Sequence, residues 1–244
     1  MIPEYVRYAY VLTGYRTGGT HFSCAMDLFA WHAETLNAWS MIVCGLASVG
    51  YYCRFGSRPR RLAAEALTAS CVLQVVPSVG FHLFRGIGIR EYSFWRRLDQ
   101  CFIFVNSVFL AYALSATVYA SPWAVVANTC ASAALSAVAC AEILRRAPHV
   151  QRRRGAIVAT VGLTVLGHLW PVLWWSYAHR DWTYAAAALA WLGAGGALFA
   201  TGTPERWWPR RFDVIGSSHQ LMHACAGAAH LVEWHFVLHV LKEL

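Results

Sequence analysis

The chain has 244 residues, of which 58% are hydrophobic and only 13% are charged. Soluble domains carry about 25% charged residues, so this composition indicates a membrane protein. The formal net charge of +8 does not indicate a nucleic-acid-binding protein, because the arginines lie in short clusters between apolar runs, as in loops that flank membrane spans.

The first 35 residues lack a basic segment followed by an apolar one, so we expect no signal peptide. Residues 1–36 are predicted to form a cytoplasmic juxtamembrane segment, and residues 37–240 a single seven-span domain. A span needs about 20 mainly apolar residues. Seven stretches meet this requirement approximately, namely 37–53, 63–84, 98–119, 123–144, 156–178, 183–202 and 213–240.

Backbone polar groups cannot remain unpaired in hydrocarbon, so these stretches are expected to be helices. The predicted fold class is therefore all-α, a seven-transmembrane helix bundle. With the N-terminus in the cytoplasm, the inner segments hold 14 of the 20 basic residues and the outer segments hold 6. The positive-inside rule then predicts a cytoplasmic N-terminus and an extracytoplasmic C-terminus, although the four arginines of the first loop count the other way.

Ionisable side chains inside spans are costly in lipid and are therefore functional candidates. His82 lies near the end of the second predicted span, with Ser78 one helical turn before it, and Asp99 opens the third span. His219 and His223 lie near the start of the seventh span. A serpentine path of seven helices brings these three span ends to the same face of the membrane, which is the cytoplasmic face in the predicted orientation.

The spacing of the histidines favours a metal site. His219 and His223 are four residues apart, so they share one helix face. Three imidazoles suit Zn²⁺, which leaves one position open in catalytic sites. Gln220 follows the first histidine, so the glutamate of the HExxH motif is absent, and Asp99 is the available carboxylate. The alternative is that the histidines hydrogen-bond across the bundle without a metal ion.

The other candidates receive structural interpretations. His230 lies on the same face as His219 but about 16 Å deeper, so we expect it to line a cavity or to form hydrogen bonds. Glu34 and Asn37 are expected to brace the site or to cap the first helix. A structural role is also expected for His168, His235 and His239. The eight cysteines form no CxxC pair and are interpreted as packing residues.

Four stretches together match a known family pattern. They are "GYRTGG" with "FAWHAETLNAWS" (29–40), "SVGFH" (78–82), "RRLDQ" around Asp99, and "PERWWPRRFDVIGSSHQLMH" (204–223). On these motifs the chain resembles the progestin and adipoQ receptor family, which includes the adiponectin receptors and the bacterial hemolysin III-like proteins. The resemblance extends from about residue 3 to residue 235.

This resemblance implies seven spans, a cytoplasmic N-terminus and a zinc ion near the cytoplasmic face, held by His82, His219 and His223. It also implies that Asp99 contacts the zinc-bound water and that Ser78 lies beside it. Adiponectin receptors are associated with ceramide hydrolysis, and alkaline ceramidases share the same constellation. The chain departs from the pattern at Met41, where the family has histidine, at Gln100 and Phe102, and in lacking the long N-terminal extension of the adiponectin receptors.

The resulting hypothesis is an integral membrane, zinc-dependent lipid amide hydrolase of the ceramidase type. Asp99 would act as general base, and Ser78 would help to stabilise the oxyanion. The alternative is a membrane receptor for an extracellular ligand, with a structural zinc ion and no turnover. A pore-forming protein ranks below both, because the spans show no ring-like repetition of charge. The expected location is the plasma membrane or an endomembrane.

Overall fold

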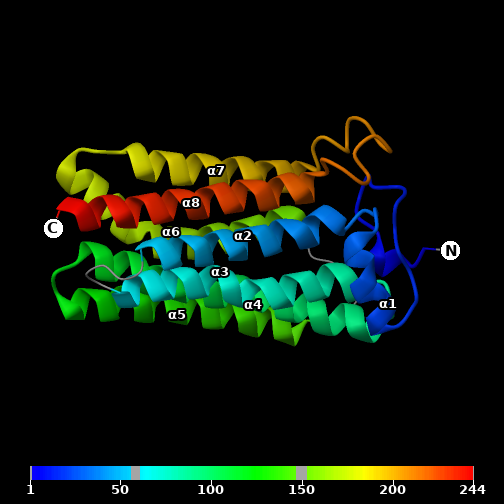
Figure 1. Cartoon of the computed structure of the whole chain (residues 1–244), viewed down its shortest axis with the longest axis horizontal. Helices are drawn as coiled ribbons and strands as arrows, with labels where there is room; N and C mark the ends of the chain where they lie inside the picture. Colours follow the sequence, from blue (N-terminus) through cyan, green and yellow to red (C-terminus); the bar gives the residue numbers. More distant parts are fainter. Residues whose placement is uncertain (1, 56–60, 147–152, 244) are drawn as a thin grey trace.

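The computed structural model describes residues 2–55, 61–146 and 153–243, and within these ranges it contains helices and no strands. Seven long helices form one bundle (Figure 1). Each is long and apolar enough to cross a membrane, which confirms the predicted fold class. They are α2 (Thr35–Phe55), α3 (Arg61–Phe84), α4 (Ile89–Val118), α5 (Pro122–Arg145), α6 (Arg154–His179), α7 (Thr183–Thr201) and α8 (Ser218–Glu243).

The N-terminal segment lies at one end of the bundle and the C-terminus at the other, as an odd number of spans requires (Figure 1). This segment holds three short helical elements, η1 (Glu4–Val6), α1 (His21–Met26) and η2 (Asp27–Phe29). The end of α3 and the first residues of α4 and α8 lie at the N-terminal end of the bundle. The side of the membrane on which this end lies stays a prediction.

Two helix starts differ from the predicted spans. The helix α4 begins at Ile89, nine residues before the predicted start at 98, because a charged amphipathic stretch continues the helix beyond the apolar run. The helix α8 begins at Ser218, five residues after the predicted start at 213. Gly216, with φ +84°, adopts the left-handed conformation there, which a helix cannot contain. Hydropathy therefore locates apolar runs and not helix ends.

The helices pack closely where side chains are small. Gly80 of α3 faces the ring of Trp95 on α4, and a Cβ atom on Gly80 would lie 2.1 Å from a ring carbon. Gly195 of α7 similarly lies against Cys225 of α8. In membrane bundles such small residues permit helices to approach each other. The close α3–α4 contact positions the last turn of α3, which carries His82.

The N-terminal segment covers this end of the bundle through polar contacts. The side chain of Asp213 accepts hydrogen bonds from the backbone N–H groups of Leu12 and Thr13, at 3.0 and 2.7 Å, and from the Thr13 hydroxyl at 2.7 Å. Two segments 200 residues apart in the sequence are thereby joined. The predicted seventh span began at Asp213, but this residue instead anchors the loop before α8.

Arg85 fastens the same segment to α3. Its guanidinium donates to the Val6 carbonyl at 2.7 Å and to Glu34 Oε1 at 2.6 Å, and it lies 4.1 Å above the Tyr8 ring. Burial would raise the pKa of Glu34, but Arg85 and then His82 hold this pKa well below its usual range. Burial would likewise lower the pKa of Arg85, but the Glu34 carboxylate raises it above its usual value. Both groups are therefore charged, and each is the main counterion of the other.

The first prediction concerns the α3–α4 contact. In Gly80→Ala, the new methyl group would overlap the Trp95 ring, and overpacking of this kind typically costs about 1–3 kcal/mol. We expect a lower midpoint of thermal unfolding for the purified protein in detergent. Gly162→Ala is the control, because its added Cβ would meet no described atom within 4 Å apart from its chain neighbours and the adjacent backbone of its own helix. A midpoint in Gly80→Ala equal to that of Gly162→Ala would contradict the close packing.

The second prediction concerns the buried ion pair. Arg85→Gln leaves the Glu34 carboxylate buried without its main counterion, and breaking a buried pair in this way costs about 3–5 kcal/mol. We expect a clear fall in the thermal midpoint. Arg61→Gln breaks an exposed pair with Glu65 and should change the midpoint little, since exposed pairs contribute little to stability. Similar midpoints for the two variants would show that the buried pair is dispensable.

Candidate metal centre

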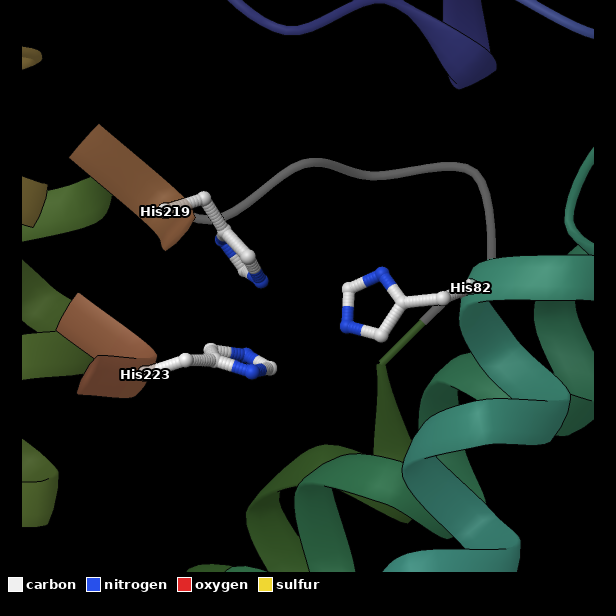
Figure 2. Close-up of side chains that lie close together, drawn as sticks. All are labelled: His82, His219 and His223. Carbon is white, nitrogen blue, oxygen red and sulfur yellow. The ribbon is translucent and has the colours of Figure 1, made fainter. Parts of the chain in front are cut away.

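Three histidines from two helices meet at the N-terminal end of the bundle. His82 lies in the last turn of α3, and His219 and His223 lie in the first two turns of α8. Figure 2 shows the three rings pointing toward one another. One ring nitrogen from each histidine lies within 4.8 Å of the others. The centroid of the His82 ring is 5.3 Å from that of His219 and 5.2 Å from that of His223.

The geometry follows from two local features of the sequence. The i, i+4 spacing places His219 and His223 on one face of α8, with their ring centroids 4.9 Å apart. The Gly80–Trp95 contact fixes α3 against α4, so the last turn of α3 holds His82 opposite that face. Among the described residues, this is the one group of histidine, cysteine or acidic side chains whose donor atoms converge closely enough for a metal ion.

Polar side chains from the start of α2 orient two of the rings. His82 Nδ1 lies 2.7 Å from Glu34 Oε2, and the Asn37 amide donates to the same oxygen at 2.8 Å. Since Glu34 is ionised, His82 Nδ1 carries a proton and donates it to the carboxylate. The unprotonated nitrogen of a neutral His82 is then Nε2. A histidine held by a carboxylate in this way is typical of metal ligands.

The Ser40 hydroxyl orients the His223 ring, as Glu34 orients the His82 ring. Its hydroxyl donates to the Asn37 carbonyl at 2.8 Å, and its oxygen lies 2.9 Å from His223 Nδ1. Because the hydroxyl proton is used on the carbonyl, the oxygen accepts from His223 Nδ1–H. The lone pair of a neutral His223 therefore lies on Nε2. One stretch of the chain, from Glu34 to Ser40, thus sets the tautomers of two rings on two other helices.

Two buried ring nitrogens of this cluster lack a hydrogen-bond partner in the described part of the chain. They are His82 Nε2 and His219 Nδ1. A buried polar atom without a partner costs about 1–3 kcal/mol. A metal ion bound by these nitrogens would remove that cost, so the residues present fit a metal with imidazole ligands.

Ser78 and Asp99 lie beside the histidines but outside the converging set. Ser78 is buried on α3, one turn before His82, and Asp99 is partly exposed on α4. The Gln74 amide donates to Asp99 Oδ1 at 2.8 Å, and the Asp99 carboxylate accepts a hydrogen bond from Ser78 and interacts electrostatically with the His82 ring. Asp99 is not one of the groups whose donor atoms lie within 4.8 Å of one another. The roles predicted for Ser78 and Asp99 stay predictions.

Glu34 was expected to brace the site or to cap the first helix, and its carboxylate braces the site through His82. Glu34 is the carboxylate in direct contact with a histidine of the centre, and Asp99 is not. The available signal was its position three residues before Asn37 at the start of a span. Ser40 and Tyr8 were not recognised. The Tyr8 ring stacks on His219 with centroids 5.4 Å apart, so the N-terminal segment covers the centre.

Two histidines interpreted as structural lie at the other end of α8. His235 Nε2 lies 3.0 Å from the Tyr51 hydroxyl. The His239 ring contacts the rings of Trp175 and Tyr184, with centroids 5.7 and 5.2 Å away. Neither residue is near the three converging histidines.

Comparisons with known proteins identify the family of this chain. The family model described as "Haemolysin-III related" matches residues 29–234. Progestin and adipoQ receptor family member 4 of Mus musculus is 32% identical, over 88% of this chain and 81% of that protein. ADIPOR-like receptor IZH3 of Eremothecium gossypii is 26% identical, over 91% of this chain and 56% of that protein.

The adiponectin receptor protein of Drosophila melanogaster is 25% identical, over 87% of this chain and 52% of that protein. The chain therefore spans little more than half the length of the fungal and fly relatives. The family model nevertheless covers most of the chain, including all three converging histidines. This integral multi-pass membrane protein accordingly belongs to the haemolysin-III-related family, together with relatives named as adiponectin receptors and as progestin and adipoQ receptors.

Proposed function

We propose that the protein is a zinc-dependent hydrolase that cleaves the amide bond of a membrane lipid of the ceramide type. The observation that carries the proposal is the convergence of His82, His219 and His223, with one nitrogen each inside a 4.8 Å group. Two of these rings are oriented by Glu34 and Ser40. Three nitrogen ligands with one open position are typical of catalytic zinc.

When bound, zinc would supply a Lewis acid that activates water and polarises a carbonyl group. The protein residues have the remaining tasks. Glu34 and Ser40 hold two imidazoles in the tautomer that presents Nε2. Asp99, next to His82 and partly exposed, would accept a proton from the attacking water as general base. The Ser78 hydroxyl would donate to the carbonyl oxygen as negative charge develops there.

The N-terminal segment would limit the access of water to the reaction. Tyr8 lies over His219 and is itself held by Arg85. Excluding water strengthens the electrostatic interactions in a site. An amide within a lipid fits this location, because the centre lies at the end of apolar helices, where headgroups and hydrocarbon meet.

A second candidate function is a receptor in which the metal ion is structural and joins α3 to α8. The names of the relatives favour it, since they are called receptors. A structural zinc site normally closes its fourth position with a protein ligand. Asp99 lies outside the converging set, and this supports an open position and therefore hydrolysis.

The third prediction concerns metal binding. Purified protein should contain about one zinc ion per chain, and His219→Ala should lose it. Ser40→Ala should keep the ion but bind it about 10–100-fold more weakly, which is typical when a hydrogen bond to a ligand is removed. Ser132→Ala is the matched control, because this buried serine donates to the Ser107 carbonyl far from the centre. Metal analysis would measure the zinc content, and chelator competition would measure the zinc affinity. Equal zinc affinity in Ser40→Ala and Ser132→Ala would contradict the tautomer assigned to His223.

The fourth prediction concerns turnover. Wild-type protein given ceramide should release sphingosine and fatty acid, lose this activity with a chelator and regain it with zinc. Asp99→Asn should lower kcat about 100- to 10,000-fold, as expected for loss of a general base, while zinc content stays unchanged. Glu65→Gln, at the other end of α3, should retain wild-type kcat. A zinc-loaded wild type that releases no sphingosine would refute the hydrolase and favour the receptor.

A further inference from the structure

A second cluster of ionisable side chains lies in the middle of the bundle. Glu233 and His230 of α8 face His168 of α6, and Glu233 and His168 are only 4% exposed. Glu233 lies ten residues after His223, which places it about 15 Å farther along the helix. The cluster is therefore separate from the metal centre. An ionisable group at this depth in a membrane is a candidate functional site.

The Glu233 carboxylate lies between the two imidazoles. Its Oε1 is 3.6 Å from His168 Nε2, and its Oε2 is 3.1 Å from His230 Nδ1. Neither ring nitrogen of His168 has a hydrogen-bond partner in the described ranges. His168 is therefore a buried imidazole whose Nε2 faces the Glu233 carboxylate without forming a full hydrogen bond. We include it in the site.

The other side of His230 is fixed by a short chain of hydrogen bonds. Trp234 Nε1 donates to Ser48 Oγ at 3.1 Å, and Ser48 Oγ lies 3.2 Å from His230 Nε2. The serine oxygen accepts from the indole, so its own proton is available for His230 Nε2. With Nε2 as acceptor, a neutral His230 carries its proton on Nδ1 and donates it to Glu233.

The geometry differs from that of the metal centre. The donor atoms of Glu233, His168 and His230 are not among the groups that lie within 4.8 Å of one another, whereas those of the three metal-site histidines are. The three bases are arranged in a row with the carboxylate in the middle. Two neighbouring atoms of such a row can share a proton. A metal ion, in contrast, needs all of its donor atoms around one point, so the row fits a proton better than a metal ion.

Charge leads to the same conclusion. An ionised Glu233 between two neutral histidines would leave one uncompensated negative charge in the apolar interior, which is strongly unfavourable. One additional proton, on a histidine or on the carboxylate, brings the cluster to zero. A further proton would make it positive. The neutral state of the three groups therefore contains one exchangeable proton.

In the described part of the chain, His168 and His230 are the basic side chains that form ion pairs with Glu233. The thiol of Cys71 on α3 interacts with Glu233, and Cys44 of α2 lies near Cys71. Between Asp99 and Tyr112, α4 contains Cys101 as its single ionisable side chain, and α7 contains none after Tyr184. The next ionisable residues on α8, His235 and His239, contact Tyr51, Trp175 and Tyr184 instead.

We propose that Glu233, His168 and His230 form a proton-binding site inside the membrane domain, and that this site holds one exchangeable proton between α6 and α8. The site does not depend on zinc or on hydrolysis. Its ligand is the proton itself. Its occupancy links the pH to the contact between α6 and the helix that carries two of the metal-site histidines.

Infrared titration of the full-length protein in lipid nanodiscs would test this proposal. Wild type should show uptake of one slowly exchanging proton by this cluster, seen as a carboxyl or an imidazolium band, within the pH range in which the protein stays folded. Glu233→Gln should lose this band, because the amide keeps the size of the side chain but cannot titrate. Glu65→Gln, which removes an exposed carboxylate, should retain it.

His168→Gln and His230→Gln retain the carboxyl group and so provide a test that does not require Glu233→Gln to fold. Each removes a base that can carry the compensating positive charge, so the band should titrate at higher pH than in wild type. Absence of proton uptake by both the Glu233 carboxyl group and the two imidazoles throughout the range would overturn the proposal. An identical titration midpoint in wild type and both histidine variants would overturn it as well.

Discussion

The arrangement at the N-terminal end of the bundle depends on one buried carboxylate. Glu34 accepts a charged hydrogen bond from Arg85 on one oxygen and faces His82 Nδ1 with the other. Arg85 in turn holds the Val6 carbonyl and lies against Tyr8. A charge buried to this degree is tolerated only when it is paired. The same pairing that makes Glu34 tolerable therefore attaches the N-terminal segment to α3 and orients the His82 ring.

The apolar environment of the membrane imposes the same requirement, that buried polar groups be paired, on the whole bundle. A polar group within a membrane domain is costly without a partner inside the protein, so a buried polar group indicates either a specific contact or a binding site. Asn37 donates to Glu34, Ser40 contacts His223, and Gln74 of α3 donates to Asp99 of α4. Large hydrophobic side chains such as Leu114 and Phe236 pack the core of the bundle and give little indication of function.

The sequence predicts those features that repeat along one helix or depend on composition. Seven apolar runs were sufficient for the fold class, and the four-residue spacing of His219 and His223 was sufficient for their common face. The start of α8 was predicted at Asp213, because hydropathy does not register that its carboxylate binds Leu12 and Thr13. Glu34 was expected to brace the site or to cap a helix, but its specific partners were not predicted, for a related reason. Its partners His82 and Arg85 lie about 50 residues away, in the last turn of α3 and directly after it. A contact of this kind follows from packing and not from local pattern.

Two polar clusters on α8 illustrate how the arrangement of donor atoms favours either a metal ion or a proton as the ligand. Near the start of the helix, one nitrogen each from His82, His219 and His223 converges on a common point. The Glu34 carboxylate contacts Nδ1 of His82, and the Ser40 hydroxyl contacts Nδ1 of His223. Farther along, the carboxylate of Glu233 itself lies between two imidazoles. A carboxylate that accepts a hydrogen bond from one ring nitrogen leaves the lone pair of the other nitrogen for a metal ion. A carboxylate that lies between two imidazoles can share only a proton with them. The same residue types, placed in a different order, thus favour different ligands.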